Sequence, residues 1–94
     1  MAIACFTPEE IRMFQNCRAI EDNKKIESQN SKTIAMLAEK ILGLGGNVPK
    51  AEEFALKPNQ TGSVLERKLD DLLQRIKWQE QIIRQYGELI AELI

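Results

Sequence analysis

The sequence predicts an all-α protein in which two long antiparallel helices, over about residues 8–42 and 64–94, are joined by a glycine- and proline-bearing linker with one short helix. Three observations predict this fold class. A helix-start signature precedes each long stretch, no proline interrupts either stretch after its first turn, and apolar residues in the second recur every three or four positions. A chain of 94 residues is the size of one domain, so we expect residues 1–94 to form a single helical hairpin.

The first helix is expected to begin at the sequence Thr7-Pro8-Glu9-Glu10. Thr7 is the predicted N-cap, Pro8 takes the first helical position, and Glu10 completes a capping box in which each residue binds the other's backbone N–H. Phe6 lies before the cap and is placed to pack on Ile11 as a hydrophobic staple.

The middle of this helix leaves two interpretations open. Its apolar residues form one group near residues 11–20 and another near residues 34–42, whereas residues 21–33 are polar except for Ile26. The helix can be continuous with a solvated or partner-facing middle, or it can break near residues 29–31, where Asn or Ser would cap a new helix. We favour the continuous helix because no strong helix breaker is present.

The linker is expected to cover residues 43–62, and the glycines at its start end the first helix. Pro49 is placed to open the short helix, over residues 50–56, with Phe54 and Leu56 as its apolar anchors. Turn-forming residues then lead the chain into the second long helix. Such a linker is long for a hairpin, and we expect it to fold back as a small lid over one end.

The second long helix has the clearest pattern. Ser63 and Glu66 form a second capping signature before an apolar run. Apolar residues then recur at alternating steps of four and three, a period of about 3.5 residues that keeps one seam towards a neighbouring helix, and Gln79 takes one slot of it. The seam consists of Leu65, Leu69, Leu72, Ile76, Ile83, Tyr86, Ile90 and Leu93.

The apolar band widens towards residue 94, and this widening predicts self-association. Ile82, Leu89 and Ile94 flank the seam, so the band is broader than one partner helix covers. We expect a homo-oligomer, most simply a dimer that forms a four-helix bundle; the alternative is that the first helix folds over the whole band. The predicted oligomer interface is Ile82, Ile83, Tyr86, Leu89, Ile90, Leu93 and Ile94.

The charge balance gives no general electrostatic reason to expect nucleic acid or an anionic membrane as a partner. The chain has 13 Lys and Arg against 14 Asp and Glu, a formal net charge of −1, with both signs spread evenly. No apolar run approaches the ~20 residues of a membrane-spanning helix, and residues 1–6 are too short for a signal peptide. We therefore expect a cytoplasmic protein with no membrane partner, in which Cys5 and Cys17 are free thiols.

No motif indicates catalysis or metal binding. The chain has no histidine, the commonest general base and metal ligand. Its paired carboxylates are adjacent in sequence, so on a helix their side chains diverge by ~100°. The glycines of residues 43–46 follow a helix and lack the Gly-Lys-Ser/Thr of a phosphate-binding loop. We expect no enzymatic activity, no cofactor and no metal site.

Two polar surfaces are candidate binding sites. One is the face of the second long helix opposite the seam, where an aromatic and an arginine, both frequent in interface hot spots, lie together. In the alternative, its tryptophan packs on the first helix or on Phe54. The predicted partner-binding residues are Lys77, Trp78, Gln81, Arg84 and Gln85. The candidate phosphate-binding residues, on the first helix, are Lys24, Lys25 and Lys32, with Gln29 and Asn30 beside them.

The leading functional expectation is a non-enzymatic protein–protein interaction module that acts as a homo-oligomer and binds another protein. It would serve as an assembly adaptor or as an inhibitor that occludes a partner surface. The alternative is a sequestering protein that binds a nucleotide or nucleic acid at basic sites between subunits. Such a protein would bind phosphate-bearing ligands with strong salt dependence, and an adaptor or inhibitor would not.

Overall fold

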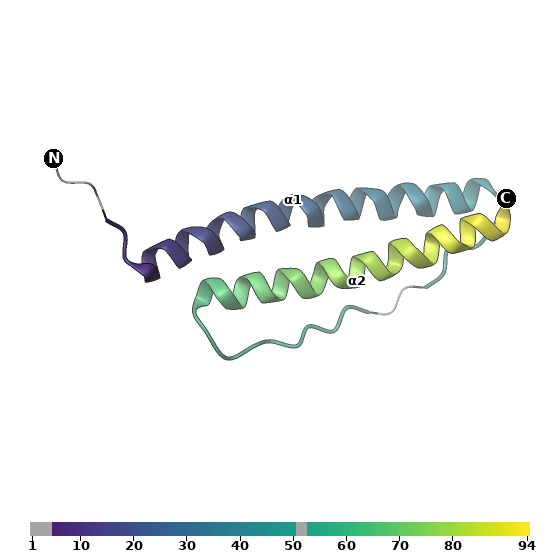
Figure 1. Cartoon of the computed structure of the whole chain (residues 1–94). Helices are drawn as coiled ribbons and strands as arrows, with labels where there is room; N and C mark the ends of the chain where they lie inside the picture. The colour runs from purple at the N-terminus through teal and green to yellow at the C-terminus, as the bar shows by residue number, and fades with distance from the viewer. Residues whose placement is uncertain (1–4, 51–52) are drawn as a thin grey trace.

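A computed structural model describes residues 5–50 and 53–94 and shows two α-helices packed side by side (Figure 1). Helix α1 spans Pro8–Gly43 and helix α2 spans Val64–Leu93. The described residues contain no strand. The all-α prediction is confirmed, and both predicted helices agree with the observed bounds to within one residue.

Helix α1 begins as predicted and does not break. The Thr7 side chain accepts a hydrogen bond from Glu10 N at 3.1 Å, and the Glu10 carboxylate accepts one from Thr7 N at 3.3 Å, which completes the capping box. Phe6 packs edge-on against Phe14, with ring centroids 5.2 Å apart. Residues 21–33 are helical throughout, so the interpretation as one continuous helix is confirmed.

The two helices run in the same direction, and the antiparallel prediction is therefore wrong. Ile20, in the first half of α1, clusters with Leu72 in the first half of α2. Ile41, near the end of α1, clusters with Ile90 near the end of α2. Figure 1 shows the same arrangement, because α1 from purple to teal and α2 from green to yellow both run from left to right. The fold keeps the connectivity of a helical hairpin, two helices and one linker, but its helices are parallel.

The linker, residues 44–63, makes this arrangement possible because its described part, residues 44–50 and 53–63, runs back along α2 (Figure 1). Early in the linker, Pro49 O accepts a hydrogen bond from the Tyr86 hydroxyl at 3.3 Å. Later, Lys57 is hydrogen-bonded to the Gln74 side chain. At ~3.3 Å per residue this segment reaches ~65 Å, which exceeds the ~45 Å length of α2. An antiparallel pair would need only a few residues.

The short helix predicted over residues 50–56 is not confirmed. Residues 50 and 53–56 have no regular secondary structure, and residues 51 and 52 lie outside the described part of the chain. Extended backbone advances about twice as far per residue as a helix, so it suits a segment that must span α2. The linker consequently lies along the side of α2 and does not form the expected lid over one end.

A polar layer divides the core into two apolar clusters. Gln79, only 3% exposed, lies between them. Its side-chain N–H group donates to Glu27 O at 3.2 Å and to the Ser31 hydroxyl at 3.0 Å. The polar middle of α1 therefore meets the polar slot in the seam of α2. The buried residues of the first cluster are Ile20, Leu72 and Ile76, and those of the second are Ile41, Ile82, Tyr86 and Ile90.

The molecule is a thin, elongated plate. Its principal extents, measured over Cα atoms, are 67 × 32 × 14 Å, so it is one helix layer thick. Over the described residues, neither helix is long and apolar enough to cross a membrane.

Candidate protein interface

The face of α2 predicted to bind a partner is shared with the linker. Trp78 is half-buried, packs against the cluster around Ile41, and has its ring centroid 5.6 Å from that of Phe54. Trp78 therefore contacts Phe54, as the alternative interpretation of the sequence expected. The other four predicted residues, Lys77, Gln81, Arg84 and Gln85, are exposed. Gln81 and Gln85 line a small hollow beside Trp78, and Lys77 lines a second hollow beside Phe54.

The apolar band of α2, predicted as an oligomer interface, is largely covered within one chain. Ile82, Tyr86 and Ile90 are between 5% and 7% exposed. Parallel packing brings the second apolar group of α1 against them, with Ile41 fully buried at the centre. Ile83, Leu89 and Leu93 are half-buried, and Ile94 is 85% exposed. A second copy is therefore not needed to bury Ile82, Tyr86 and Ile90. The sequence left this alternative open, in which the first helix covers the band.

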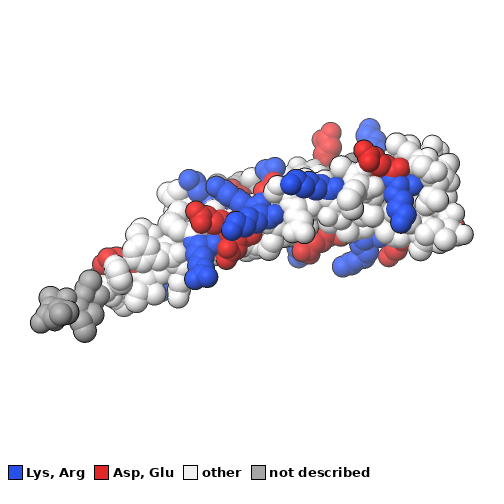
Figure 2. Space-filling model, turned by 90° about the horizontal axis from the view of Figure 1, so that it is seen from above, with Lys and Arg blue, Asp and Glu red and all other residues white. Residues whose placement is uncertain are grey.

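The candidate phosphate-binding lysines lie on one open surface of α1. Lys24, Lys25 and Lys32 are exposed and line a shallow hollow of about 580 Å³ with Ser28 and Gln29. Figure 2, which looks down on α1, shows basic side chains gathered over the middle of the molecule with carboxylates between them. The basic groups are therefore partly offset by neighbouring acidic ones.

Asn30, predicted beside these lysines, belongs to the helix interface. Its side-chain N–H group is buried and has no hydrogen-bond partner, and the same is true of the side-chain oxygen of Gln79. The two atoms are a donor and an acceptor in the same polar layer. The polar layer is thus incompletely satisfied in a single chain.

The structure reveals an apolar surface that the sequence analysis missed. We call it the apolar end, and its members are Phe6, Ile11, Met13 and Phe14 at the start of α1 and Val64 at the start of α2. These side chains are between 45% and 58% exposed. Parallel packing is the cause, because it brings the first turns of both helices to the same end of the molecule (Figure 1). The sequence did carry a signal: Ile11, Met13 and Phe14 point in different directions on a helix, so one neighbouring helix cannot cover all three.

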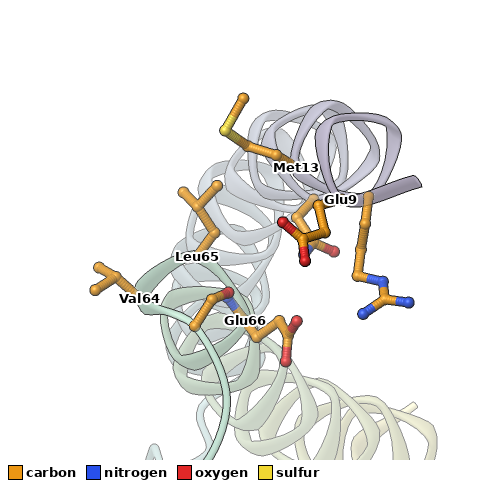
Figure 3. A pocket seen from close by; sticks show the side chains of 8 residues that line it. Glu9, Met13, Val64, Leu65 and Glu66 are labelled. Carbon is orange, nitrogen blue, oxygen red and sulfur yellow. The ribbon is translucent and has the colours of Figure 1, made fainter. Parts of the chain in front are cut away.

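An open hollow of about 460 Å³ lies at the apolar end, between the first turns of the two helices. Figure 3 shows Met13, Val64 and Leu65 on one side of it and the carboxylates of Glu9 and Glu66 on the other. Arg12 also lines the hollow, so it has an apolar wall and a wall that carries charges of both signs.

The thiols and the possible metal-ligating side chains form no further site among the described residues. Cys5 and Cys17 are free, as expected, and both are exposed. Among the described residues, no three His, Cys, Asp or Glu side chains are placed to hold a metal ion. The chain matches no protein-family model, no curated protein and no solved structure.

Proposed function

We propose that this chain is a non-enzymatic protein–protein interaction module that acts as a homo-oligomer, most simply a dimer, joined through the apolar end. The observation that carries the proposal is the gathering of five half-exposed apolar side chains at one end of the molecule. Exposed apolar side chains gathered in this way are typical of an interface. Fully burying one Phe or Met side chain stabilises a complex by about 1.5–3 kcal/mol.

The arrangement of the two helices supports a bundle at this end. Two copies that face each other there bring four first turns together, and a four-helix bundle is the ordinary way to bury such side chains. The exposed residues Lys77, Arg84 and Gln85 of α2 stay outside this contact. They are then available to another protein, as an adaptor or an inhibitor requires.

The test is the mass of the full chain in solution, measured by light scattering, with Phe14→Glu as the disrupting variant. We expect a dimer at tens of micromolar for the unchanged chain and a monomer for Phe14→Glu, because the new carboxylate would be buried without a partner. Met36→Glu is the matched control. Met36 lies on the same helix and is more exposed, at 65%, but lies far from the apolar end, so this variant should remain a dimer.

Helical content, measured by circular dichroism, should be unchanged in both variants because both positions are exposed. A monomeric unchanged chain at this concentration contradicts the proposal. Equal loss of association in Phe14→Glu and Met36→Glu would also contradict it, because the effect would then be one of charge and not of position.

A second candidate function is the binding of a nucleotide or nucleic acid. It is favoured by one observation, the alignment of Lys24, Lys25 and Lys32 along one hollow. Calorimetric titration with nucleotides and short oligonucleotides tests it. Binding that falls steeply with salt and is abolished by Lys24→Glu with Lys25→Glu would establish this function, and the absence of binding would remove it.

A further inference from the structure

Linker residues 53–57, which we call the strap, contact α2 through backbone hydrogen bonds and one aromatic side chain, as an extended peptide contacts a receptor. The Gln74 side chain forms two hydrogen bonds to the backbone of one strap residue. Its oxygen accepts from Lys57 N at 3.0 Å, and its nitrogen donates to Lys57 O at 2.8 Å. A neighbouring strand would satisfy the same two groups in a sheet. Because only backbone atoms are recognised, any residue except proline at position 57 can make this contact.

The Gln74 amide is held in the orientation that this contact needs. Its nitrogen also donates to the Asp70 carboxylate, at 2.8 Å. A carboxylate accepts hydrogen bonds only, so Asp70 fixes the nitrogen on its own side and leaves the Gln74 oxygen for the incoming N–H. The backbone clamp is therefore built into α2.

An aromatic contact lies beside this backbone clamp, on the same surface of α2. Phe54 packs against Trp78, with ring centroids 5.6 Å apart, and the Arg75 guanidinium lies 5.3 Å from the Phe54 ring centroid. Cations are attracted to an aromatic face. Arg75 is also placed by Glu27 of α1, with nitrogen and oxygen 3.7 Å apart. A ring three residues before the clamped backbone thus contacts both an indole and a cation.

The charges of the strap and the groove are complementary. Glu53, directly before the aromatic residue, lines the same hollow of about 520 Å³ as Lys77. Lys77 therefore presents a positive group to the hollow that Glu53 lines, and Lys57 of the strap lines the same hollow. An extended acidic–aromatic segment is the chemistry that this surface fits.

The strap is held weakly enough to be displaced. Four of its five residues are exposed, and only Phe54 is half-buried. Both hydrogen bonds to Gln74 are exposed, and the segment has no regular secondary structure. Segments with few buried contacts open at a much lower free energy than the whole fold.

We propose that the groove formed by Gln74, Arg75, Lys77 and Trp78 binds an extended segment of another protein in which a carboxylate precedes an aromatic residue, and that the strap is the internal ligand that occludes this groove. Main-chain hydrogen bonds supply affinity and a side-chain pocket supplies specificity, as in other extended-peptide receptors. The inference rests on the proposed function only in making the chain a protein-binding module. It uses a different surface from the apolar end.

The test measures binding of a dye-labelled peptide with the sequence of residues 53–58 to the full chain, by fluorescence anisotropy. The tethered strap competes at an effective concentration near the millimolar range, so the unchanged chain should bind the peptide weakly. Phe54→Ala empties the aromatic site of its internal ring, and this variant should bind the peptide at least ~10-fold more tightly. The same peptide with its Phe replaced by Ala should not bind.

Leu56→Ala is the matched control, because Leu56 lies in the strap but is exposed and does not line the groove. It should bind the peptide like the unchanged chain. Lys57→Pro is a second way to loosen the strap, since it removes the N–H that Gln74 accepts, and it should reproduce the gain of Phe54→Ala. Adding Gln74→Ala to Phe54→Ala should abolish the gain.

Two results would overturn the inference: no gain in either strap variant, or an equal gain in Leu56→Ala. The single tryptophan of the chain gives an independent readout, because peptide binding should restore the Trp78 emission altered by Phe54→Ala. Repeating the titration with Phe14→Glu separates the two proposals. If that variant is monomeric and still responds to Phe54→Ala, peptide binding stands whatever the outcome at the apolar end.

Discussion

Gln79 sets the register of the two helices. Its side-chain N–H group reaches Glu27 O and the Ser31 hydroxyl together, and a slip of either helix by one turn would break both bonds. A single polar residue in an apolar seam commonly fixes register at a cost in stability. The cost is visible here, because the Gln79 side-chain oxygen is buried without a hydrogen-bond partner.

Gln79→Leu should therefore raise the free energy of unfolding, by about 1 kcal/mol, because it removes an unsatisfied buried oxygen and continues the apolar seam. Ser31 is exposed, so its hydroxyl can bind water in the variant. Chemical denaturation measures the change. Gln79→Ala is the control: it removes the same hydrogen bonds without filling the volume and should lower the free energy of unfolding. A large destabilisation in Gln79→Leu would show that the two hydrogen bonds outweigh the buried oxygen.

At the scale of the helix, the two N-termini differ in one respect. Both caps accept a hydrogen bond from the third residue of their helix, Thr7 from Glu10 N and Ser63 from Glu66 N, each at 3.1 Å. Only Glu10 returns a bond to the backbone of its cap. Among the described hydrogen bonds, the Glu66 carboxylate accepts none from Ser63 N, so the capping box predicted for α2 is only half formed.

This difference predicts unequal costs for two equivalent glutamates. Thr7→Ala and Ser63→Ala should each lower the free energy of unfolding by about 0.5–2 kcal/mol. Glu10→Ala should cost more than Glu66→Ala, because both carboxylates interact with a helix dipole but only Glu10 completes a box. Denaturation midpoints of the four variants measure these costs. Equal costs for the two glutamates would contradict the structure of the caps.

Helix bounds could be predicted from the sequence because they depend on local chemistry. The Thr7 cap, the Ser63 cap and the glycines after α1 act within one turn, so neighbouring residues suffice. The direction of packing depends on the whole chain. Gln79 lies near the middle of α2 and its partners lie near the middle of α1, so a polar layer forms in either direction. The length of the linker was the one signal that distinguished them.

The candidate surfaces could be predicted only in part for the same reason. Periodicity correctly placed Lys77, Gln81 and Arg84 on an exposed face of α2. It could not show that Phe54 would lie on Trp78, because that contact exists only when the linker runs back along the helix. The apolar end was likewise invisible in an antiparallel arrangement, where the start of α1 lies far from the start of α2.

At the scale of the whole molecule, the shape itself favours assembly. The radius of gyration is 18.6 Å, against ~12 Å for a compact domain of this length. A plate one helix thick has no second layer to cover its faces. Side chains that face neither the other helix nor the strap are consequently exposed, as Ile26 and Leu73 are, at 44% and 46%. Such a molecule gains more from a partner than a globular domain does.

The parallel direction of the helices is the feature on which both proposed surfaces depend, and it can be measured directly. Spin labels at positions 42 and 92 should give a short distance, because both lie at the same end and neighbouring helix axes are ~10 Å apart. Labels at 42 and 68 should be separated by nearly the length of α2, since 24 helical residues span ~36 Å. All three positions are exposed, and Cys5→Ser with Cys17→Ser provides a background without other thiols.

Labels at positions 18 and 68 complete the test. They should be close in the parallel arrangement and far apart in an antiparallel one, so the pattern across the three pairs identifies the direction without reference to any single distance. Mixing labelled chain with an excess of unlabelled chain removes distances between copies of an oligomer. A short 42–68 distance together with a long 18–68 distance would show an antiparallel hairpin. The linker would then not run along α2, so the strap could not contact Gln74 and Trp78. The residues of the apolar end would lie at opposite ends of the molecule.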